Sequence, residues 1–299
     1  MKRDIILPDY VRDFMKVFVN TGFEIYLVGG AVRDLLLEKK TKNFDFTTNA
    51  TPEKIQKMFE KTHYNNIYGT VTIPVEITDG ISDGRTRGVT GTGSPGVGEE
   101  RLEKLIFEVT PYRREGKYKD FRHPEKIDWA KTLEEDVARR DFTINALAHD
   151  GKKLIDYVGG MQDLGKKLVR AVGEPKARFC EDALRLIRAV RIASELGFMI
   201  EEHTRAAITR NAPLIQHVSW ERVGSEMLKI ISSDHPAEGV LFLKNTGLLK
   251  LILPELDATF DVAQKSPGRH HIYDVGTHLV ETLRNCPSKN TIVRFAALI

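Results

Sequence analysis

A strand–glycine–helix–strand pattern near the N-terminus constrains the fold of this chain more than any other feature. The apolar residues 25–28 predict a short buried strand. Gly29 and Gly30 follow it, residues 31–37 have a helical composition, and a second strand is predicted at 44–47. Glycines let backbone N–H groups approach a bound group closely, and the first turn of a helix offers unpaired donors. The pattern is therefore suited to holding phosphate, although a glycine pair alone also fits an ordinary tight turn.

Two further motifs change how this pattern is interpreted. An Arg-Arg-Asp-Phe-Thr-Ile-Asn-Ala block occupies residues 139–146, and a Glu-Asp-Ala-Leu-Arg-Leu-Ile-Arg-Ala-Val-Arg block occupies residues 181–191. In this order, the three motifs together resemble the tRNA nucleotidyltransferase and poly(A) polymerase family, on its bacterial (class II) side. The resemblance runs from about residue 25 to the end of the chain and is interrupted between residues 77 and 104.

The resemblance implies an α/β N-terminal nucleotidyltransferase domain, like that of DNA polymerase β, followed by an all-α region. We expect a catalytic head domain over residues 1–150, with a flexible insertion at about 78–104 that has no assigned role. A helical neck over residues 151–235 would recognise the nucleotide base. Residues 236–299 would form a helical body that contains an incomplete HD-like region. The abrupt apolar end of the sequence suggests a truncated chain.

The periodic patterns predict several elements in detail. Helices are expected at 8–21, 181–196, 204–211, 219–231 and 237–246, and a helix begins near residue 133. A helix preceded by Thr51 as N-cap, with Pro52 as its first residue, is also expected. Further strands are expected at 69–77, 105–111 and 153–156, and only helices beyond the last of these.

The reaction implied by the resemblance is attack of an RNA 3′-hydroxyl on the α-phosphate of a nucleoside triphosphate. Two Mg²⁺ ions held by an Asp-x-Asp pair would assist it, with Mn²⁺ as the alternative metal. This chain has Asn43, Phe44 and Asp45 in that place, so Asp45 matches the second aspartate and a neutral amide matches the first. An amide oxygen can bind Mg²⁺ but brings no charge. Glu108, on a later strand, is predicted as another carboxylate of the site, with a solvated strand residue as the alternative.

The resemblance also implies a nucleotide-binding set drawn from all three motifs. Its members are Gly29, Gly30, Arg33, Asp34, Arg140, Asp141, Asn145, Asp182, Arg185, Arg188 and Arg191. Arg188 and Arg191 would clamp phosphates, and Asp182 with Arg185 would read the base edge. A carboxylate accepts hydrogen bonds from the amino groups of C or A, and a guanidinium donates to ring-nitrogen or carbonyl acceptors. The pair would therefore accept CTP and ATP. The alternative is a salt bridge along one helix side.

Charge and cysteine content exclude little. The net charge is +3, which permits nucleic-acid binding without requiring it. Basic residues crowd one stretch of the chain, namely Arg113, Arg114, Lys117, Lys119, Arg122 and Lys126. Two cysteines are too few for a disulfide framework, and no apolar run is long enough to span a bilayer, so we expect a cytoplasmic protein with no membrane partner.

The predicted activity is template-independent addition of C and A to the 3′ end of tRNA. A poly(A) polymerase, or an enzyme that adds only CC or only A, remains open. So does a non-catalytic nucleotide- or RNA-binding protein, because Asn43 replaces a metal-binding aspartate. The oligomeric state is not predicted.

Overall fold

The computed structural model describes residues 5–65, 69–78, 102–115, 127–264 and 273–299. These residues fall into two compact units. The first is drawn from residues 1–114, 127–137 and 145–157, and the second from residues 115–126, 138–144 and 158–299. The head, neck and body boundaries expected from the sequence stay predictions.

A seven-stranded mixed sheet forms the centre of the first unit. Its strand order is β3-β4-β5-β2-β1-β8-β9. Strands β2 and β5 are parallel, and every other neighbouring pair is antiparallel. The strands are β1 (Ile25–Val28), β2 (Phe44–Thr48), β3 (His63–Asn65), β4 (Thr70–Thr78), β5 (Leu102–Pro111), β8 (Ala148–His149) and β9 (Leu154–Ile155). The five strands predicted from sequence are confirmed, with shifts at their ends. A separate two-stranded sheet pairs β6 (Arg113–Glu115) with β7 (Ile127–Trp129).

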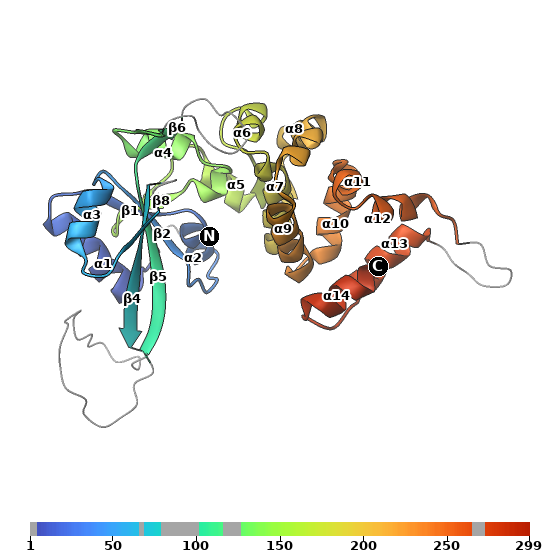
Figure 1. The fold of residues 1–299 in the computed structure, drawn as a ribbon, viewed down its shortest axis with the longest axis horizontal. Helices are drawn as coiled ribbons and strands as arrows, with labels where there is room; N and C mark the ends of the chain where they lie inside the picture. Colours follow the sequence, from blue (N-terminus) through green and yellow to red (C-terminus); the bar gives the residue numbers. More distant parts are fainter. Residues whose placement is uncertain (1–4, 66–68, 79–101, 116–126, 265–272) are drawn as a thin grey trace, which may run out of the picture. The chain divides into compact units, whose positions relative to one another are not determined.

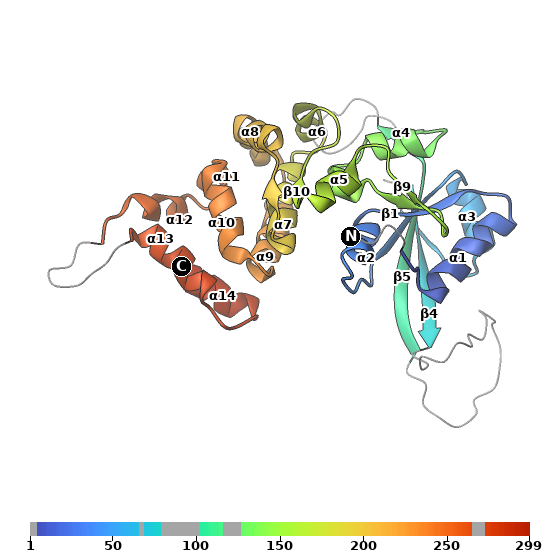
Figure 2. The same ribbon diagram turned by 180° about the vertical axis from the view of Figure 1, so that it is seen from behind.

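Helices α1 (Asp9–Asn20) and α3 (Pro52–Met58) cover one face of this sheet, as Figures 1 and 2 show. The ring of Phe14 on α1 lies 4.9 Å from that of Phe46 and 4.8 Å from that of Phe107, centroid to centroid. Phe44 and Phe46 are buried on this face, and the intervening Asp45 is exposed. Because side chains alternate along a strand, the aromatic core fixes the face from which Asp45 projects.

The remaining helices of the first unit are short. They are α2 (Gly30–Leu36) and α4 (Leu133–Ala138). A 3₁₀ turn, η1 (Thr143–Asn145), begins in the second unit and ends in the first. Thr51 occupies the N-cap position of α3 and Pro52 begins the helix, as predicted.

The second unit is mostly helical. Its helices are α5 (Gly160–Gly165), α6 (Pro175–Glu181), α7 (Leu184–Leu196), α8 (Glu202–Asn211), α9 (Trp220–Ser232), α10 (Pro236–Asn245), α11 (Leu248–Ile252), α12 (Pro254–Ala258), α13 (Val275–Arg284) and α14 (Thr291–Leu298). Two 3₁₀ turns, η2 (Ala212–His217) and η3 (Thr259–Asp261), join them. The predicted helices at 204–211, 219–231 and 237–246 are confirmed as α8, α9 and α10.

The C-terminal region that was predicted to be all-α also contains two short strands. Strands β10 (Leu168–Val169) and β11 (Met199–Ile200) form a small parallel sheet within the second unit. Two-residue strands are too short to produce an alternating pattern, so the sequence carried no signal for them. Gly197 ends α7 in the left-handed conformation, at φ 66°, as predicted, and β11 follows it closely.

No helix in the described part of the chain is both long and apolar enough to traverse a bilayer.

Some predictions fall outside the described residues. The insertion predicted at about 78–104 falls mostly outside the description, because residues 79–101 are not described, while Thr78 in β4 pairs with Leu102 in β5. Lys117, Lys119, Arg122 and Lys126 of the basic stretch also lie outside the description, as do residues 265–272 of the expected HD-like region.

Candidate functional site

Gly29 makes the turn between β1 and α2. Its φ of 76° and ψ of −144° form a combination that is essentially restricted to glycine. Gly30 begins α2, and a Cβ atom there would lie 3.5 Å from Nη2 of Arg33. The glycine pair therefore leaves the backbone after β1 uncovered by side chains, and it lies where the sequence predicted the turn.

Asp45 and Glu108 are direct register partners on the parallel strands β2 and β5. Register partners in such a pair project from the same face, so both carboxylates leave the sheet on the side opposite the aromatic core. Both side chains are exposed to solvent. Partial desolvation, followed by the negative charge of Asp45, raises the pKa of Glu108 above its usual value. These two carboxylates are thus close enough to repel each other, and a cation between them would relieve the repulsion.

Asn43 is exposed and lies two residues before Asp45, just outside β2. Asp45 also pairs in register with Val28, the last residue of β1, so the glycine turn begins at this same edge of the sheet. The donors gathered here are carboxylate and amide oxygens, which suit a hard divalent cation. Among the described residues, no group of three or more His, Cys, Asp or Glu side chains is arranged to hold a metal. A cation at Asp45 and Glu108 would therefore need further ligands besides these two carboxylates.

Arg33 connects the first motif to the second. Its Nε donates a 2.8 Å hydrogen bond to Oδ1 of Asp34, and its Nη1 donates one of 2.8 Å to Oδ1 of Asn145. Arg33 and Asn145 are both buried. Three predicted nucleotide-binding residues therefore form one hydrogen-bonded network, and it fixes the Arg33 guanidinium beside Gly30.

Asp141 forms an ion pair with Arg188 inside the second unit. Oδ2 of Asp141 accepts hydrogen bonds from Nη2 of Arg188 at 2.6 Å and from its Nε at 3.1 Å. Burial opposes the charge on Asp141, but the charge and hydrogen bonds of Arg188, with the charge of Arg185, lower the pKa of Asp141 to about 2. The charge of Asp141 in turn raises the pKa of Arg188. Arg140, the preceding residue, is half-buried.

The helix predicted over residues 181–196 is wrong at its start. Helix α6 ends at Glu181, Asp182 is extended at φ −138° and ψ 106°, and α7 begins at Leu184. Oδ1 of Asp182 accepts a hydrogen bond of 3.0 Å from the backbone N–H of Leu184. Aspartate side chains that bond the backbone in this way interrupt or cap a helix rather than continue it.

This break separates Asp182 from Arg185, so the predicted meeting of the two on one helix side is also wrong. Nη1 of Arg185 donates to Oε2 of Glu181 at 2.5 Å, and its Nη2 donates to the backbone oxygen of Arg139 at 3.1 Å. Oδ2 of Asp182 accepts from Nη2 of Arg222 on α9 at 3.3 Å. The side chain of Asp182 is 24% exposed, whereas that of Arg185 is 10% exposed.

Helix α9 supplies partners that the sequence did not identify. Besides Arg222, it carries Glu226, whose Oε2 lies 2.6 Å from Nε of Arg191. Arg191 also contacts Glu195 at 2.9 Å. No local signal marks Arg222 as a partner, because it lies 40 residues after Asp182.

The predicted site residues therefore fall into two sets. The first unit gathers Gly29, Gly30, Arg33, Asp34, Asn43, Asp45, Glu108 and Asn145, and the second unit gathers Arg140, Asp141, Asp182, Arg185, Arg188 and Arg191. In the first set Arg33, Asp34 and Asn145 form one hydrogen-bonded network, and in the second Asp141 pairs with Arg188.

Two family models match this chain in the order that the motifs suggest. The model described as the poly A polymerase head domain matches residues 25–170. The model described as the probable RNA and SrmB-binding site of polymerase A matches residues 197–260.

Curated relatives and solved structures agree with these matches. A CCA-adding enzyme of Geobacillus thermodenitrificans is 42% identical over 229 residues, which cover 76% of this chain and 50% of the relative. A CCA-adding enzyme of Levilactobacillus brevis is 39% identical over 265 residues, which cover 88% of this chain and 60% of the relative. The crystal structure of the Bacillus stearothermophilus CCA-adding enzyme in complex with CTP matches with a TM-score of 0.68 at 32% identity, over 85% of this chain and 57% of that one.

The mixed sheet and the mostly helical remainder have the fold of a nucleotidyltransferase head domain with a helical C-terminal region. The chain belongs to the tRNA nucleotidyltransferase and poly(A) polymerase family, which confirms the resemblance carried by the three motifs. It spans about half the length of the curated relatives that it matches.

Proposed function

We propose that this chain is a template-independent RNA nucleotidyltransferase that adds C and A, from CTP and ATP, to the 3′ end of tRNA. The observation that carries the proposal is the register pairing of Asp45 with Glu108, at the edge of the sheet where the turn at Gly29 begins. Relatives named CCA-adding enzyme, at about 40% identity, support the choice of reaction.

Asp45 and Glu108, with the amide oxygen of Asn43, would hold Mg²⁺, or Mn²⁺ in its place. Such an ion supplies Lewis-acid stabilisation of the transferring phosphate. The backbone N–H groups near Gly29 and Gly30 would bind triphosphate oxygens, and the network of Arg33, described above, would orient a positive charge toward the nucleotide. Positioning and charge neutralisation are the main contributions that phosphoryl transfer needs from a protein.

Asp182 would read the base of the incoming nucleotide. Its carboxylate is oriented by the N–H of Leu184 and by Arg222, yet remains partly exposed. It can therefore accept a hydrogen bond from the exocyclic amino group that C and A share and that U lacks. Arg185 is more deeply buried and already donates to Glu181 and to the backbone oxygen of Arg139, so it would have to exchange one of these bonds to donate to the base edge.

The test is incubation of the protein with tRNA that lacks its CCA end and with each labelled nucleoside triphosphate singly and in pairs. Incorporation of CTP twice, followed by ATP once, supports CCA addition. Incorporation of only C, only A, or a long A tract identifies the corresponding specialised enzyme and contradicts the proposal. The variant Asp45→Ala is the matched negative control.

One observation favours a second candidate, a nucleotide-binding protein without catalysis. Asn43 and Asp45 together carry one negative charge fewer than an Asp-x-Asp pair. Nucleotide binding without incorporation, with incorporation restored by Asn43→Asp, would establish this alternative.

We propose the cytoplasm as the compartment, in keeping with a tRNA substrate. Fractionation of cells with an antibody against the chain tests this assignment, and recovery in the membrane pellet contradicts it.

A further inference from the structure

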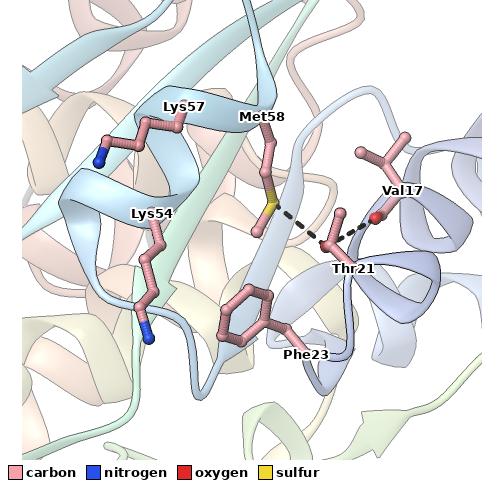
Figure 3. Close-up of a pocket in the computed structure, with 6 residues that line it drawn as sticks. All are labelled: Val17, Thr21, Phe23, Lys54, Lys57 and Met58. Carbon is pink, nitrogen blue, oxygen red and sulfur yellow. Dashed lines mark hydrogen bonds between the residues drawn. The ribbon is translucent and has the colours of Figure 1, made fainter.

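A cavity of about 390 Å³ lies in the first unit between the C-terminal end of α1 and helix α3. Six side chains line it, as Figure 3 shows: Val17, Thr21, Phe23, Lys54, Lys57 and Met58. Its volume is at the lower end of the range for small-ligand sites, and it is largely open to solvent.

The cavity belongs to the helical layer and not to the carboxylate site. Phe14 of α1 packs against Phe46 and Phe107 on the buried face of the sheet. Asp45 and Glu108 project from the opposite face, because side chains alternate along β2 and β5. The proposed nucleotidyl transfer therefore leaves this cavity without a role.

The lining is apolar and offers few groups for polar recognition. Val17, Phe23 and Met58 are half-buried and supply aliphatic, aromatic and thioether surface. The hydroxyl of Thr21 is already engaged, since it donates to the backbone oxygen of Val17 at 2.9 Å and approaches Sδ of Met58 at 3.7 Å. Methionine adapts readily to partner side chains of different shapes. The cavity thus suits an apolar side chain.

The rim of the cavity is positively charged. Lys54 and Lys57 lie three residues apart on α3 and are both exposed. Nζ of Lys54 lies 5.2 Å from the centroid of the Phe23 ring, as a cation over an aromatic face. Neither lysine forms an ion pair with any other described residue. Glu53 lies one turn before Lys57 on α3. Its charge offsets only one of the two lysines, so these three residues together are positively charged.

We propose that this cavity docks an acidic protein segment, which inserts an apolar side chain between α1 and α3 and places carboxylates against Lys54 and Lys57. Charge complementarity with the lysines favours an acidic partner, and the apolar lining favours insertion of an apolar side chain.

Single-stranded RNA fits the site less well. Bases bind such surfaces by stacking on open aromatic faces, and the ammonium of Lys54 already lies over the ring of Phe23.

The test measures binding of a fluorescent peptide to the full chain by anisotropy. The peptide is an amphipathic helix of about fifteen residues, with leucines at helical spacing and glutamates between them. Two comparison peptides replace the glutamates with lysines or the leucines with serines. The protein variant is Lys54→Glu with Lys57→Glu, and the matched control is Lys250→Glu, which changes an exposed lysine of the second unit. Lys54→Gln with Lys57→Gln repeats the test without adding negative charge beside Glu53.

We expect the acidic peptide to bind the wild type and the Lys250→Glu control alike. Its affinity should fall at least about tenfold in the double variants and with either comparison peptide. Circular dichroism establishes that each variant is folded. Equal binding of the acidic and lysine peptides, undiminished binding by the double variants, or no binding at millimolar protein overturns the proposal. A labelled single-stranded RNA that binds more tightly than the peptide, and that loses affinity in the same variants, overturns it in favour of an RNA site.

Discussion

The ion pair between Asp141 and Arg188 allows a quantitative prediction of stability. Asp141→Asn keeps the shape of the side chain but removes its charge. The pair and its neighbours lower the pKa of Asp141 from 3.8 to about 2. Each unit of such a shift corresponds to about 1.4 kcal/mol, so the charge of Asp141 contributes about 2 kcal/mol of stability at neutral pH. We expect Asp141→Asn to lower the free energy of unfolding of the second unit by that amount at pH 7.

The sign of the pH dependence follows from the direction of the shift. The folded-state pKa of Asp141 lies below its unfolded value, so the stabilisation is fully present above the unfolded value of 3.8 and is lost as the pH falls through about 2. At pH 3 about half of the stabilisation remains. The difference between wild type and variant should therefore shrink to about 1 kcal/mol at pH 3.

Urea unfolding at pH 7 and pH 3, followed by circular dichroism, measures both differences. Asp234→Asn is the matched control, because Asp234 pairs with Lys289 at 3.8 Å and both side chains are exposed. An exposed pair of this kind contributes less than about 1 kcal/mol. A loss below about 0.5 kcal/mol for Asp141→Asn at pH 7, or a loss that is equal at both pH values, would refute the assignment of this stabilisation to the ion pair.

Four further predictions concern the nucleotidyl-transfer site. Asp45→Ala should abolish nucleotide incorporation while the melting temperature is unchanged, and near-normal turnover in a primer-extension assay would exclude Asp45 as the principal metal ligand. Asn43→Asp should raise activity at limiting Mg²⁺ at least about tenfold, or about 1.4 kcal/mol of barrier, and coincident Mg²⁺ titrations would show that Asn43 does not occupy a ligand position. Asp182→Ala should weaken discrimination of CTP over UTP by about 1–3 kcal/mol in single-nucleotide incorporation, and unchanged selectivity would leave Asp182 with only its capping role. Gly29→Ala should destabilise the first unit by about 1–3 kcal/mol in thermal unfolding because of its backbone conformation, and a wild-type melting temperature would contradict that reasoning.

Sequence patterns predicted the elements whose signals are local. The apolar run of β1, the alternation of Phe44, Asp45 and Phe46 in β2, and Gly197 at the end of α7 each depend on neighbouring residues alone. Glu108 was predicted to join Asp45 from its place on a later strand, and the register of β2 and β5 agrees with that prediction.

Partner choice over long distances was not predictable from patterns. The sequence placed Asp182 and Arg185 in one motif, but the three-residue spacing predicted a contact between them only if the helix were continuous. The capping bond from Leu184 to Asp182 breaks that helix, and packing of α9 against α7 then decides which side chains pair. Arg222 could be identified only once the tertiary structure had brought it to Asp182.

The ion pairs made by α9 determine how long a segment must be if it is to be exchanged between relatives with its partners intact. All three motifs end by Arg191. Asp182 nevertheless pairs with Arg222 of α9, and Arg191 pairs with Glu226 of the same helix. Figures 1 and 2 show α9 beside α7. Recombination between relatives with a crossover between α8 and α9 would therefore separate Asp182, the carboxylate proposed to read the base, from Arg222. Only exchanges that carry α7 and α9 together would keep the partners of Asp182 and Arg191 on α9 matched.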